Sequence, residues 1–355
     1  MKTLYLSTLI TLIAYGAMAQ KALYQNFNFP IGFAINPRLM KKNASYHQIV
    51  SLHANTVTAE NAMKVKNLQP QEGVFTFDDA DYVVNFAKSQ GKRVHGHTLV
   101  WYHPMASPWM KEIRDSATLE NALKKHIQTV VKHFKGKVTS WDVVNEAFDD
   151  DDGLIRTDSL NHNKQPVLNL GKILGKDYVP RMFIYAHEAD PNALLFYNDY
   201  GQENKPNKQK AILSMVQDFK KRNIPIHGLG LQMHTHSWID PQKIEKVIEE
   251  SAQTGLLVHI SELDVLVNKD KKEDYVYSDE EKAKQAQIFS TVITSYLKYV
   301  PKNQQYGITM WNVSDADSWL TINNKREGKT VMDYPLLFDH NYQLKPIAIK
   351  AFLGK

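Results

Sequence analysis

The chain of 355 residues is 43% hydrophobic and 23% charged, which is the balance of a globular protein with ample material for a core. Its net charge of +5, without a basic stripe of interleaved aromatic residues, excludes a nucleic-acid-binding protein. It contains no cysteine, so its stability depends on the core and not on disulfides.

A secretory signal peptide is expected over residues 1–19. Lys2 precedes an apolar run over residues 4–18, and a cleavage site of the A-x-A type ends it. A membrane anchor fits less well, because the run is short and contains hydroxyl residues. We therefore expect export to the periplasm or out of the cell, with a mature catalytic domain over residues 20–355 and no membrane span in it.

Short β-like runs then alternate with amphipathic helical stretches. Four of the helical stretches have start signals: Asp78 and Thr118 as N-caps, Asp240 before a proline, and Ser278 at the head of a capping box. The β-like runs are Ile31–Ile35, Ala54–Thr58, Arg93–Val100, Val138–Val144, Ala193–Tyr197, Ile226–Leu231, Leu257–Ile260 and Tyr306–Trp311. Eight alternating units of about 40 residues in one domain predict an α/β fold, the (β/α)8 TIM barrel.

Two of these runs lead to a glutamate. Glu146 comes after Val138–Val144, and Glu262 comes after Leu257–Ile260. In a (β/α)8 barrel both would lie at the C-terminal ends of the strands, where the active sites of this fold lie. One such glutamate alone would ordinarily be solvated. Two strand-end carboxylates are what glycosidic bond cleavage needs, one as acid and the other as nucleophile or base.

The ends of the other runs carry amides, imidazoles, a lysine and tryptophans. Sugar C–H faces stack on indole rings, and sugar hydroxyls need donors and acceptors close together. This mixture at one barrel mouth predicts a carbohydrate site. The side chains in question belong to Asn61, Lys64, His97, Trp101, Asn198, Gln232, His234, Trp311 and Trp319.

The chain resembles glycoside hydrolase family 10, the endo-β-1,4-xylanases, over residues 29–353. The resemblance depends on several motifs in a fixed order. They are Glu60–Lys64, Gly96–Trp101, Trp141–Phe148, Ala189–Pro191, Asn198–Tyr200, Gly230–Gln232, Ser261–Asp264, Trp311 with Asp315–Trp319, and Pro335–Asp339.

The resemblance implies a retaining endo-1,4-β-xylanase in which Glu146 is the acid/base and Glu262 the nucleophile. Asn145 would hold the sugar 2-hydroxyl, and His234 would hydrogen-bond the nucleophile with Asp264 behind it. Retention depends on the resemblance alone, because one barrel mouth can hold either carboxylate spacing. We expect xylan and xylo-oligosaccharides as partners, a monomer, and no metal or cofactor. The residues implied to line the glycone side are Asn61, Lys64, His97, Trp101, Gln232, Trp311 and Trp319.

The sequence departs from the family pattern at Val65, where a tryptophan is usual, at Tyr102, where a histidine is usual, and at Asn312, where a glycine is usual. None of these changes the carboxylates. We expect the insert Val267–Tyr277 to be a solvated loop. We also expect Lys208–Lys210 with Lys220–Arg222 to form a solvated helix face.

Three other interpretations remain. The pairs His95/His97 and His234/His236 have a spacing that metal ligands can have, as in a metal-dependent amidohydrolase barrel, although that class needs its pair at the end of strand one. A mannanase or cellulase barrel shares the two glutamates. A non-catalytic sugar-binding protein would be expected to have lost one carboxylate, and both are present.

Overall fold

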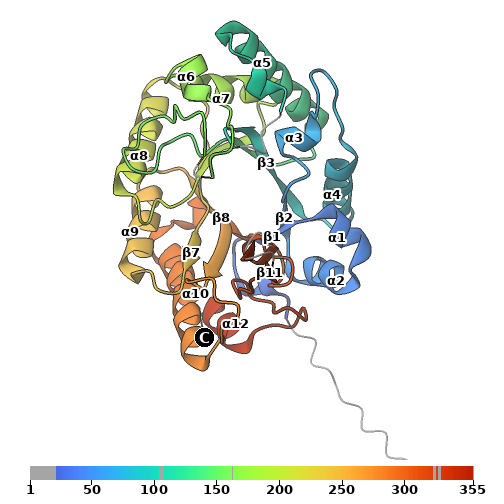
Figure 1. The fold of residues 1–355 in the computed structure, drawn as a ribbon, viewed down its shortest axis with the longest axis vertical. Helices are drawn as coiled ribbons and strands as arrows, with labels where there is room; N and C mark the ends of the chain where they lie inside the picture. The colour runs from blue at the N-terminus through green and yellow to red at the C-terminus, as the bar shows by residue number, and fades with distance from the viewer. Residues whose placement is uncertain (1–20, 104–107, 162, 323–324, 327–328, 355) are drawn as a thin grey trace, which may run out of the picture.

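Parallel strands surrounded by helices form a closed barrel (Figure 1). The computed structural model describes residues 21–103, 108–161, 163–322, 325–326 and 329–354. The strands pair in chain order, and the pairs β1–β9 and β6–β8 complete the ring. The predicted (β/α)8 barrel is confirmed. The expected signal peptide lies outside the described residues.

All eight predicted strands are present, with ends shifted by a few residues. The largest shift is in β8, which continues past Ile260 to Leu266, so Glu262 lies inside this strand and not after it. The barrel strands are β1 (Ile31–Ile35), β2 (Thr56–Ala59), β3 (Arg93–Trp101), β4 (Ser140–Asn145), β5 (Leu194–Asp199), β6 (Gly228–Leu231), β8 (Leu257–Leu266) and β9 (Gln305–Met310).

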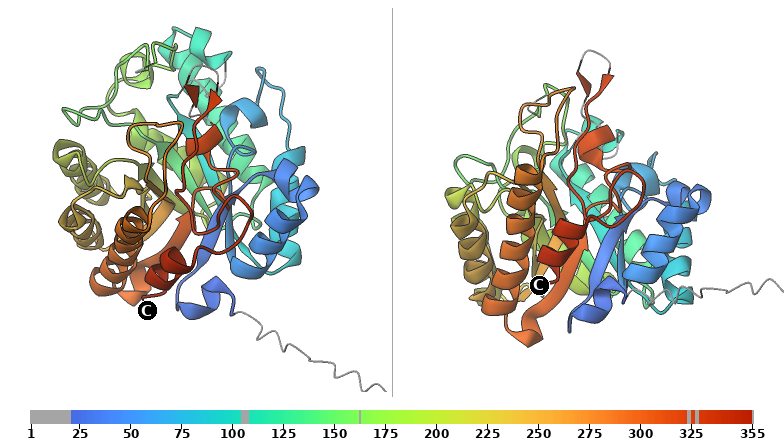
Figure 2. Two further views of the ribbon diagram at one scale, coloured as in Figure 1. Left: turned by 60° about the horizontal axis from the view of Figure 1, so that its bottom comes forward. Right: turned by 90° about the horizontal axis from the view of Figure 1, so that it is seen from below.

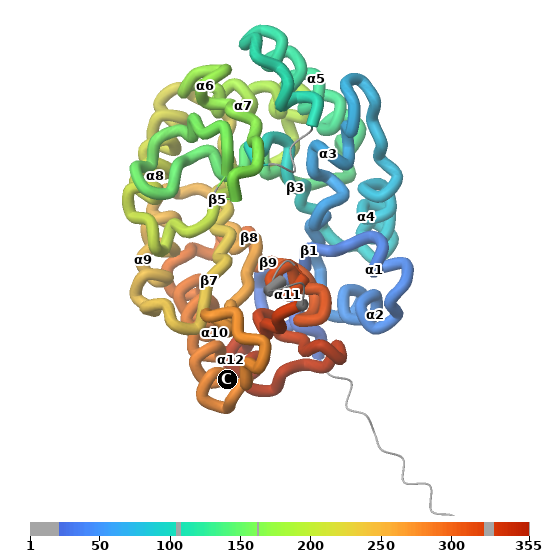
Figure 3. Tube along the Cα trace, in the orientation of Figure 1, coloured from blue at the N-terminus to red at the C-terminus, as the bar shows by residue number. Residues whose placement is uncertain are grey.

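Three short strands were not predicted. β7 (His234–His236) follows β6 and pairs in parallel with the outer part of β8. Figure 3 shows β7 beside β8. The strands β10 (Lys325–Arg326) and β11 (Lys329–Thr330) pair with each other. Figure 2 shows them, with the helix α11 (Trp319–Ile322), at the end of the barrel where the strands finish. The C-terminal end of the barrel therefore carries extra structure.

The helices cover the outside of the barrel (Figure 1), and none in the described residues is long and apolar enough to cross a membrane. The remaining helices are α1 (Pro37–Lys42), α2 (Ala44–His53), α3 (Val65–Leu68), α4 (Asp78–Ser89), α5 (Ser116–His133), α6 (Leu170–Leu174), α7 (Tyr178–Ala189), α8 (Pro206–Lys221), α9 (Pro241–Ala252), α10 (Asp279–Tyr299) and α12 (Pro346–Phe352), with 3-10 turns η1 (Leu23–Asn26), η2 (Met110–Glu112) and η3 (Lys302–Gln304).

Two of the four helix start signals are confirmed. Asp240 caps α9 and Ser278 caps α10, each through its side-chain oxygen. The other two are wrong. Asp78 is the first residue of α4 and makes no cap bond. Asp115 caps α5 in place of Thr118, because its carboxylate accepts from both the amide (2.7 Å) and the hydroxyl (2.6 Å) of Thr118.

A layer of rings fills the barrel below its C-terminal mouth. The ring centroids of Phe196 and Tyr306 are 4.5 Å apart, and those of His95 and His259 are 4.8 Å apart. Gly228 makes room for this layer, since a Cβ on it would lie 2.0 Å from the Phe196 ring. The interior is therefore a packed floor beneath the mouth.

We predict that Gly228→Ala destabilises the fold by about 1–3 kcal/mol, because the added methyl group forces the buried Phe196 ring to move. The free energy of unfolding in urea measures this. In a Phe196→Leu background the same glycine change should cost clearly less. Equal losses in both backgrounds would show that the ring contact is not the cause.

Candidate active site

The two glutamates reach the barrel mouth in different ways. Glu146 directly follows the last residue of β4 and has a left-handed backbone, with φ of 58°. Glu262 lies within β8, where the register with β9 shifts between Ile260 and Leu263. Such an irregularity re-aims a side chain relative to a regular strand. Both residues are buried, with 8% and 4% of their surface exposed.

Glu262 is held by donors on both carboxylate oxygens. Asn198 donates from Nδ2 to Oε1 at 2.7 Å, and Nε2 of His234 lies 3.2 Å from Oε2. Burial alone would raise the pKa of Glu262, but His97 and His234 beside it outweigh burial and leave that pKa below its usual value. The carboxylate therefore stays ionised at neutral pH.

His234 lies between two carboxylates. Its Nδ1 is 2.8 Å from Oδ2 of Asp264, on the side away from Glu262. Burial would lower the pKa of His234, but the charges of Asp264 and Glu262 raise it to about 10. Asp264 is held in turn by the indole Nε1 of Trp319, at 2.8 Å. A protonated imidazole is thus fixed beside Glu262.

Glu146 also accepts several N–H donors. Trp101 donates from Nε1 to Oε2 at 2.8 Å, and the side chains of Asn145 and Gln232 each donate to Oε1 at 2.9 Å. The oxygen of Asn145 accepts from Nδ2 of Asn198 at 2.9 Å. Asn198 therefore touches both the Asn145 amide and Glu262, and it links the two glutamates.

The structure also brings the predicted aromatic and cationic residues together. Lys64 is buried, and its ammonium lies 5.0 Å from the Trp101 ring and 5.5 Å from the Trp311 ring. The rings of His97 and Trp311 are 5.2 Å apart. Asn61 follows β2 at the same end of the barrel, where its main-chain oxygen accepts from Nδ2 of Asn67 at 2.8 Å.

One departure from the family pattern has a structural explanation. Asn312 has φ of 83°, a left-handed conformation that asparagine tolerates better than most residues. Its Oδ1 accepts from the main-chain N–H of Trp319 at 2.9 Å. Asn312 thus keeps a backbone conformation that suits glycine and adds a contact that fixes the start of α11.

Of the four histidines considered as metal ligands, His95, His97 and His234 contact carboxylates, whereas His236 contacts a tryptophan ring. Nδ1 of His97 lies 2.9 Å from Oδ2 of Asp142, and Nε2 of His95 lies 3.0 Å from Oδ1 of the same residue. His236 stacks on Trp238 with centroids 4.3 Å apart. Among the described residues, no three His, Asp or Glu side chains are arranged to hold a metal ion.

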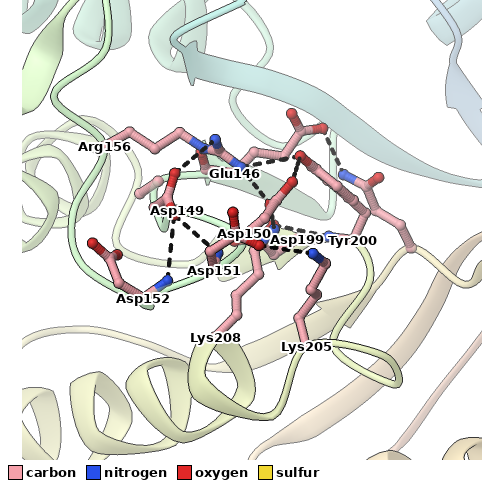
Figure 4. Close-up of polar contacts among 12 residues, drawn as sticks. Glu146, Asp149, Asp150, Asp151, Asp152, Arg156, Asp199, Tyr200, Lys205 and Lys208 are labelled. Carbon is pink, nitrogen blue, oxygen red and sulfur yellow. Dashed lines mark hydrogen bonds and ion pairs between the residues drawn. The ribbon is translucent and has the colours of Figure 1, made fainter. Parts of the chain in front are cut away.

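Arg156, which the sequence did not single out, holds the main chain at Glu146 (Figure 4). Its Nε lies 3.3 Å from the carbonyl oxygen of Glu146, and its own N–H donates to the carbonyl of Ala147 at 2.9 Å. The N–H of Glu146 donates to the carbonyl of Asn198, and that of Ala147 to the hydroxyl of Tyr197, both at 2.9 Å. Every main-chain polar group of Glu146 and Ala147 is therefore paired.

The acidic loop Asp149–Asp152, which follows Glu146, is held in place by α8 (Figure 4). Asp150 accepts from Arg156 at 2.6 Å and from Nζ of Lys208 at 3.0 Å, and Lys208 also lies 2.6 Å from Asp199. Lys208 is fully buried, so the expectation of a solvated helix face is wrong for it. Two carboxylates on its ammonium compensate the loss of water. The sequence could not show this, because the two partners belong to other elements.

Known proteins match this chain over nearly its whole length. The sequence profile described as Glycosyl hydrolase family 10 matches residues 19–353. A beta-1,4-xylanase of Dictyoglomus thermophilum is 35% identical over 339 residues, which is 94% of this chain and 88% of that protein. The endo-1,4-beta-xylanase A of a Caldicellulosiruptor species is 37% identical over 91% of this chain. The chain spans only 45% of that relative, and 28% and 27% of two others.

Solved structures agree with the sequence matches. TsXylA, an intracellular xylanase of Thermoanaerobacterium saccharolyticum solved with xylotriose, superposes with a TM-score of 0.82 at 33% identity, over 94% of this chain and 99% of that one. A xylanase of Cellvibrio japonicus solved with xylopentaose gives 0.84 at 34% identity, over 94% and 68%. With a barrel of this design, two linked glutamates at its mouth and these matches, the chain belongs to glycosyl hydrolase family 10.

Proposed function

We propose that this protein is an endo-1,4-β-xylanase that hydrolyses internal bonds of xylan with retention of configuration. The observation that carries the proposal is the pair Glu146 and Glu262, buried at one barrel mouth and linked through Asn198. The names of the relatives and the xylo-oligosaccharides in related structures support xylan as the substrate. Lys64, Trp101, Trp311 and Trp319 offer indole faces and donors to the sugar.

In the first step, Glu146 donates its proton to the glycosidic oxygen while a carboxylate oxygen of Glu262 attacks the anomeric carbon. The C–O bond to the leaving chain breaks and an ester bond to Glu262 forms. In the second step, Glu146 takes a proton from water, the water oxygen attacks the same carbon, and Glu262 leaves as a carboxylate. The imidazolium of His234 stabilises that leaving carboxylate.

We also propose export, because the apolar run over residues 4–18 has the features of a signal peptide. N-terminal sequencing of protein secreted by its host would test this. A chain that keeps residues 1–19 and remains inside the cell would contradict it.

Glu262→Ala should lower the rate on xylan by a factor on the order of 10⁴ or more, because no covalent intermediate forms. Added azide should restore part of the rate and give the inverted glycosyl azide.

Comparing the intact protein on xylan, mannan and cellulose tests the substrate class. A preference for mannan or cellulose would contradict the proposal.

Glu146→Ala should abolish xylan hydrolysis but spare the first step on an aryl xylobioside, whose leaving group needs no proton. The glycosyl-enzyme should then accumulate, so stopped-flow absorbance should record a burst of aryl release. Azide should speed turnover and give a product of retained configuration. Equal impairment on both substrates, without a burst, would make Glu146 a structural residue.

His234→Asn should move the acidic limb of the kcat/KM profile to higher pH. Glu262 has a lowered pKa while the imidazolium contacts it, so loss of that charge lets the pKa of Glu262 rise. Rates across pH 3–7 on the aryl xylobioside, about the range in which carboxyl groups titrate, measure the limb. His133→Asn is the control, because the His133 ring contacts Asp81 on the outer helices. This change should leave the acidic limb at the same pH as in the parent.

Arg156→Ala should lower kcat on xylan by about 10- to 100-fold with a smaller change in KM, since a displaced Glu146 protonates the leaving oxygen poorly. The loss on the aryl xylobioside should be smaller, because its first step needs no acid. Arg222→Ala is the control, since Arg222 bridges Asp177 and Asp218 on the surface. Similar rates in both variants would contradict a positioning role for Arg156.

A further inference from the structure

His95 lies in the layer of rings beneath the barrel mouth, but its polar contacts lead toward the glutamate site. Its Nε2 lies 3.0 Å from Oδ1 of Asp142, and Oδ2 of the same carboxylate lies 2.9 Å from Nδ1 of His97. That nitrogen of His97 is also 3.9 Å from Oε1 of Glu262. We call these four residues the floor row. The floor row joins the interior of the barrel to the carboxylate of Glu262.

Two hydroxyl groups hold the lower end of the floor row. Nδ1 of His95 lies 2.6 Å from the hydroxyl oxygen of Ser140, which also contacts the hydroxyl group of Tyr306. Burial raises the pKa of Tyr306, so this phenol keeps its proton and can donate a hydrogen bond to Ser140. Ser140 can then donate to Nδ1 of His95, which leaves the N–H group of the imidazole on Nε2, the nitrogen nearest Asp142.

The floor row carries charge in the interior of the protein. Each of its four side chains is buried, so charges along it interact in a medium of low dielectric constant. Burial would raise the pKa of Asp142, but His95 and His97 outweigh burial and hold that pKa below its usual value. Asp142 is therefore an anion. Burial raises the pKa of Glu262 and the charge of Asp142 adds to this effect, although the histidines beside Glu262 leave its pKa low.

Glu262 is not free to move away from this repulsion, because the strand that carries it is fixed beyond its end. The insert Val267–Tyr277 follows β8, and its residues 269–274 are exposed, as expected of a solvated loop. The base of the insert contradicts that expectation. There the buried carboxylate of Asp333 accepts from the main-chain N–H groups of Val267 (3.0 Å) and of the next residue (3.1 Å). The ionisation of Glu262 therefore depends on the charges around it.

His259 offers a comparison, because it lies in the same layer but pairs with a hydroxyl group in place of a carboxylate. Its ring centroid is 4.8 Å from that of His95 and 5.1 Å from that of Tyr306, and its Nε2 lies 2.9 Å from the hydroxyl oxygen of Thr309. Burial lowers the pKa of His259, so its ring is neutral at neutral pH. The two histidines therefore share their packing and differ in the contact with Asp142.

Charged and titratable side chains face the floor row from several elements. Those around His95 are His259 of β8, Tyr306 of β9 and Arg93 of β3, whose guanidinium lies 3.8 Å from the centre of the Tyr306 ring. Those around Glu262, besides the floor row, are Lys64 after β2, Glu146 after β4, His234 of β7 and Asp264 of β8. The second group lines the mouth, whereas His95 reaches Asp142 from the interior. A change at His95 therefore alters the charge balance without removing a side chain of the mouth.

We infer that His95 is a positioning residue for the nucleophile Glu262, because it balances the charge of Asp142 and so limits the repulsion between the two carboxylates. The inference rests on the proposed function for the role of Glu262. It adds a residue of the barrel interior to the groups that prepare this carboxylate for attack.

The direct test is a titration of the Glu262 carboxyl group by 13C NMR in protein labelled at glutamate, with Glu262→Gln to assign the signal. His95→Phe keeps a ring in the layer but removes the N–H group beside Asp142. The repulsion on Glu262 then grows and disfavours its ionised form, so the pKa of Glu262 should rise by about 0.5–1 pH unit. The acidic limb of kcat/KM on an aryl xylobioside should move to higher pH with it. His95→Gln, whose amide can donate in place of Nε2, should restore most of the parent value.

His259→Phe is the matched control, because it makes the same substitution in the same layer and leaves the contacts of Asp142 in place. Both ring changes should lower the free energy of unfolding, but only His95→Phe should move the titration of Glu262. In an Asp142→Asn background, His95→Phe should cause no further rise, because the charge through which it acts is gone. If His95→Phe does not fold, Ser140→Ala gives the test. It leaves every ring in place, frees Nδ1 of His95, and should raise the pKa of Glu262 as well.

The same pKa of Glu262 in the parent and in His95→Phe would overturn the inference. An equal rise in His259→Phe would also overturn it, because the effect would then come from packing. The titration needs no turnover, so it decides the inference whether or not the protein is a xylanase. Absence of any xylobioside hydrolysis by the parent would instead overturn the proposed function.

Discussion

Two carboxyl groups buried at one end of a barrel are the constraint on which the rest of this structure depends. Each would be costly to bury alone, because water is withdrawn from a potential charge. The amide of Asn198 reaches both sides of the pair, and Trp101, Gln232 and His234 supply further donors. These donors come from different strands, so the barrel must close correctly before the pair can be accommodated.

A second set of charges holds the loop that follows the first glutamate. Arg156 fixes the main chain of Glu146, Asp150 fixes Arg156, and the buried Lys208 joins Asp150 to Asp199. The helix α8 thus fixes the position of the loop and of the Glu146 main chain, through ion pairs that are largely shielded from solvent. Such pairs are screened less by salt than surface pairs, so the loop should keep its place across ionic strengths.

Much of this could be predicted from the sequence, because hydrophobic periodicity reports on local structure. The apolar runs located the barrel strands, and Glu146 and Glu262 were found two residues after the ends of two of these runs. The prediction was wrong where two nearby residues compete for the same hydrogen bond. It was also wrong where the partner of a side chain lies far away in the sequence. Asp115 and Thr118 are both acceptable caps, and only the structure shows which one accepts. Lys208 has the spacing of a solvated lysine, and its buried partners lie on other elements. No spacing in the chain indicates that Asn198 lies between the glutamates.

The left-handed backbone of Glu146 has an evolutionary consequence. A residue with a Cβ costs about 1–2 kcal/mol more than glycine in this conformation. Glycine or asparagine at this position would therefore relax the chain, while the proposed acid/base role requires glutamate. The side chain cannot be lost without a cost elsewhere, because the donors of Trp101, Asn145 and Gln232 would be left without their acceptor. A glycine at this position would therefore need matching changes in the three donors, so the strained backbone and the donors around it can change only together.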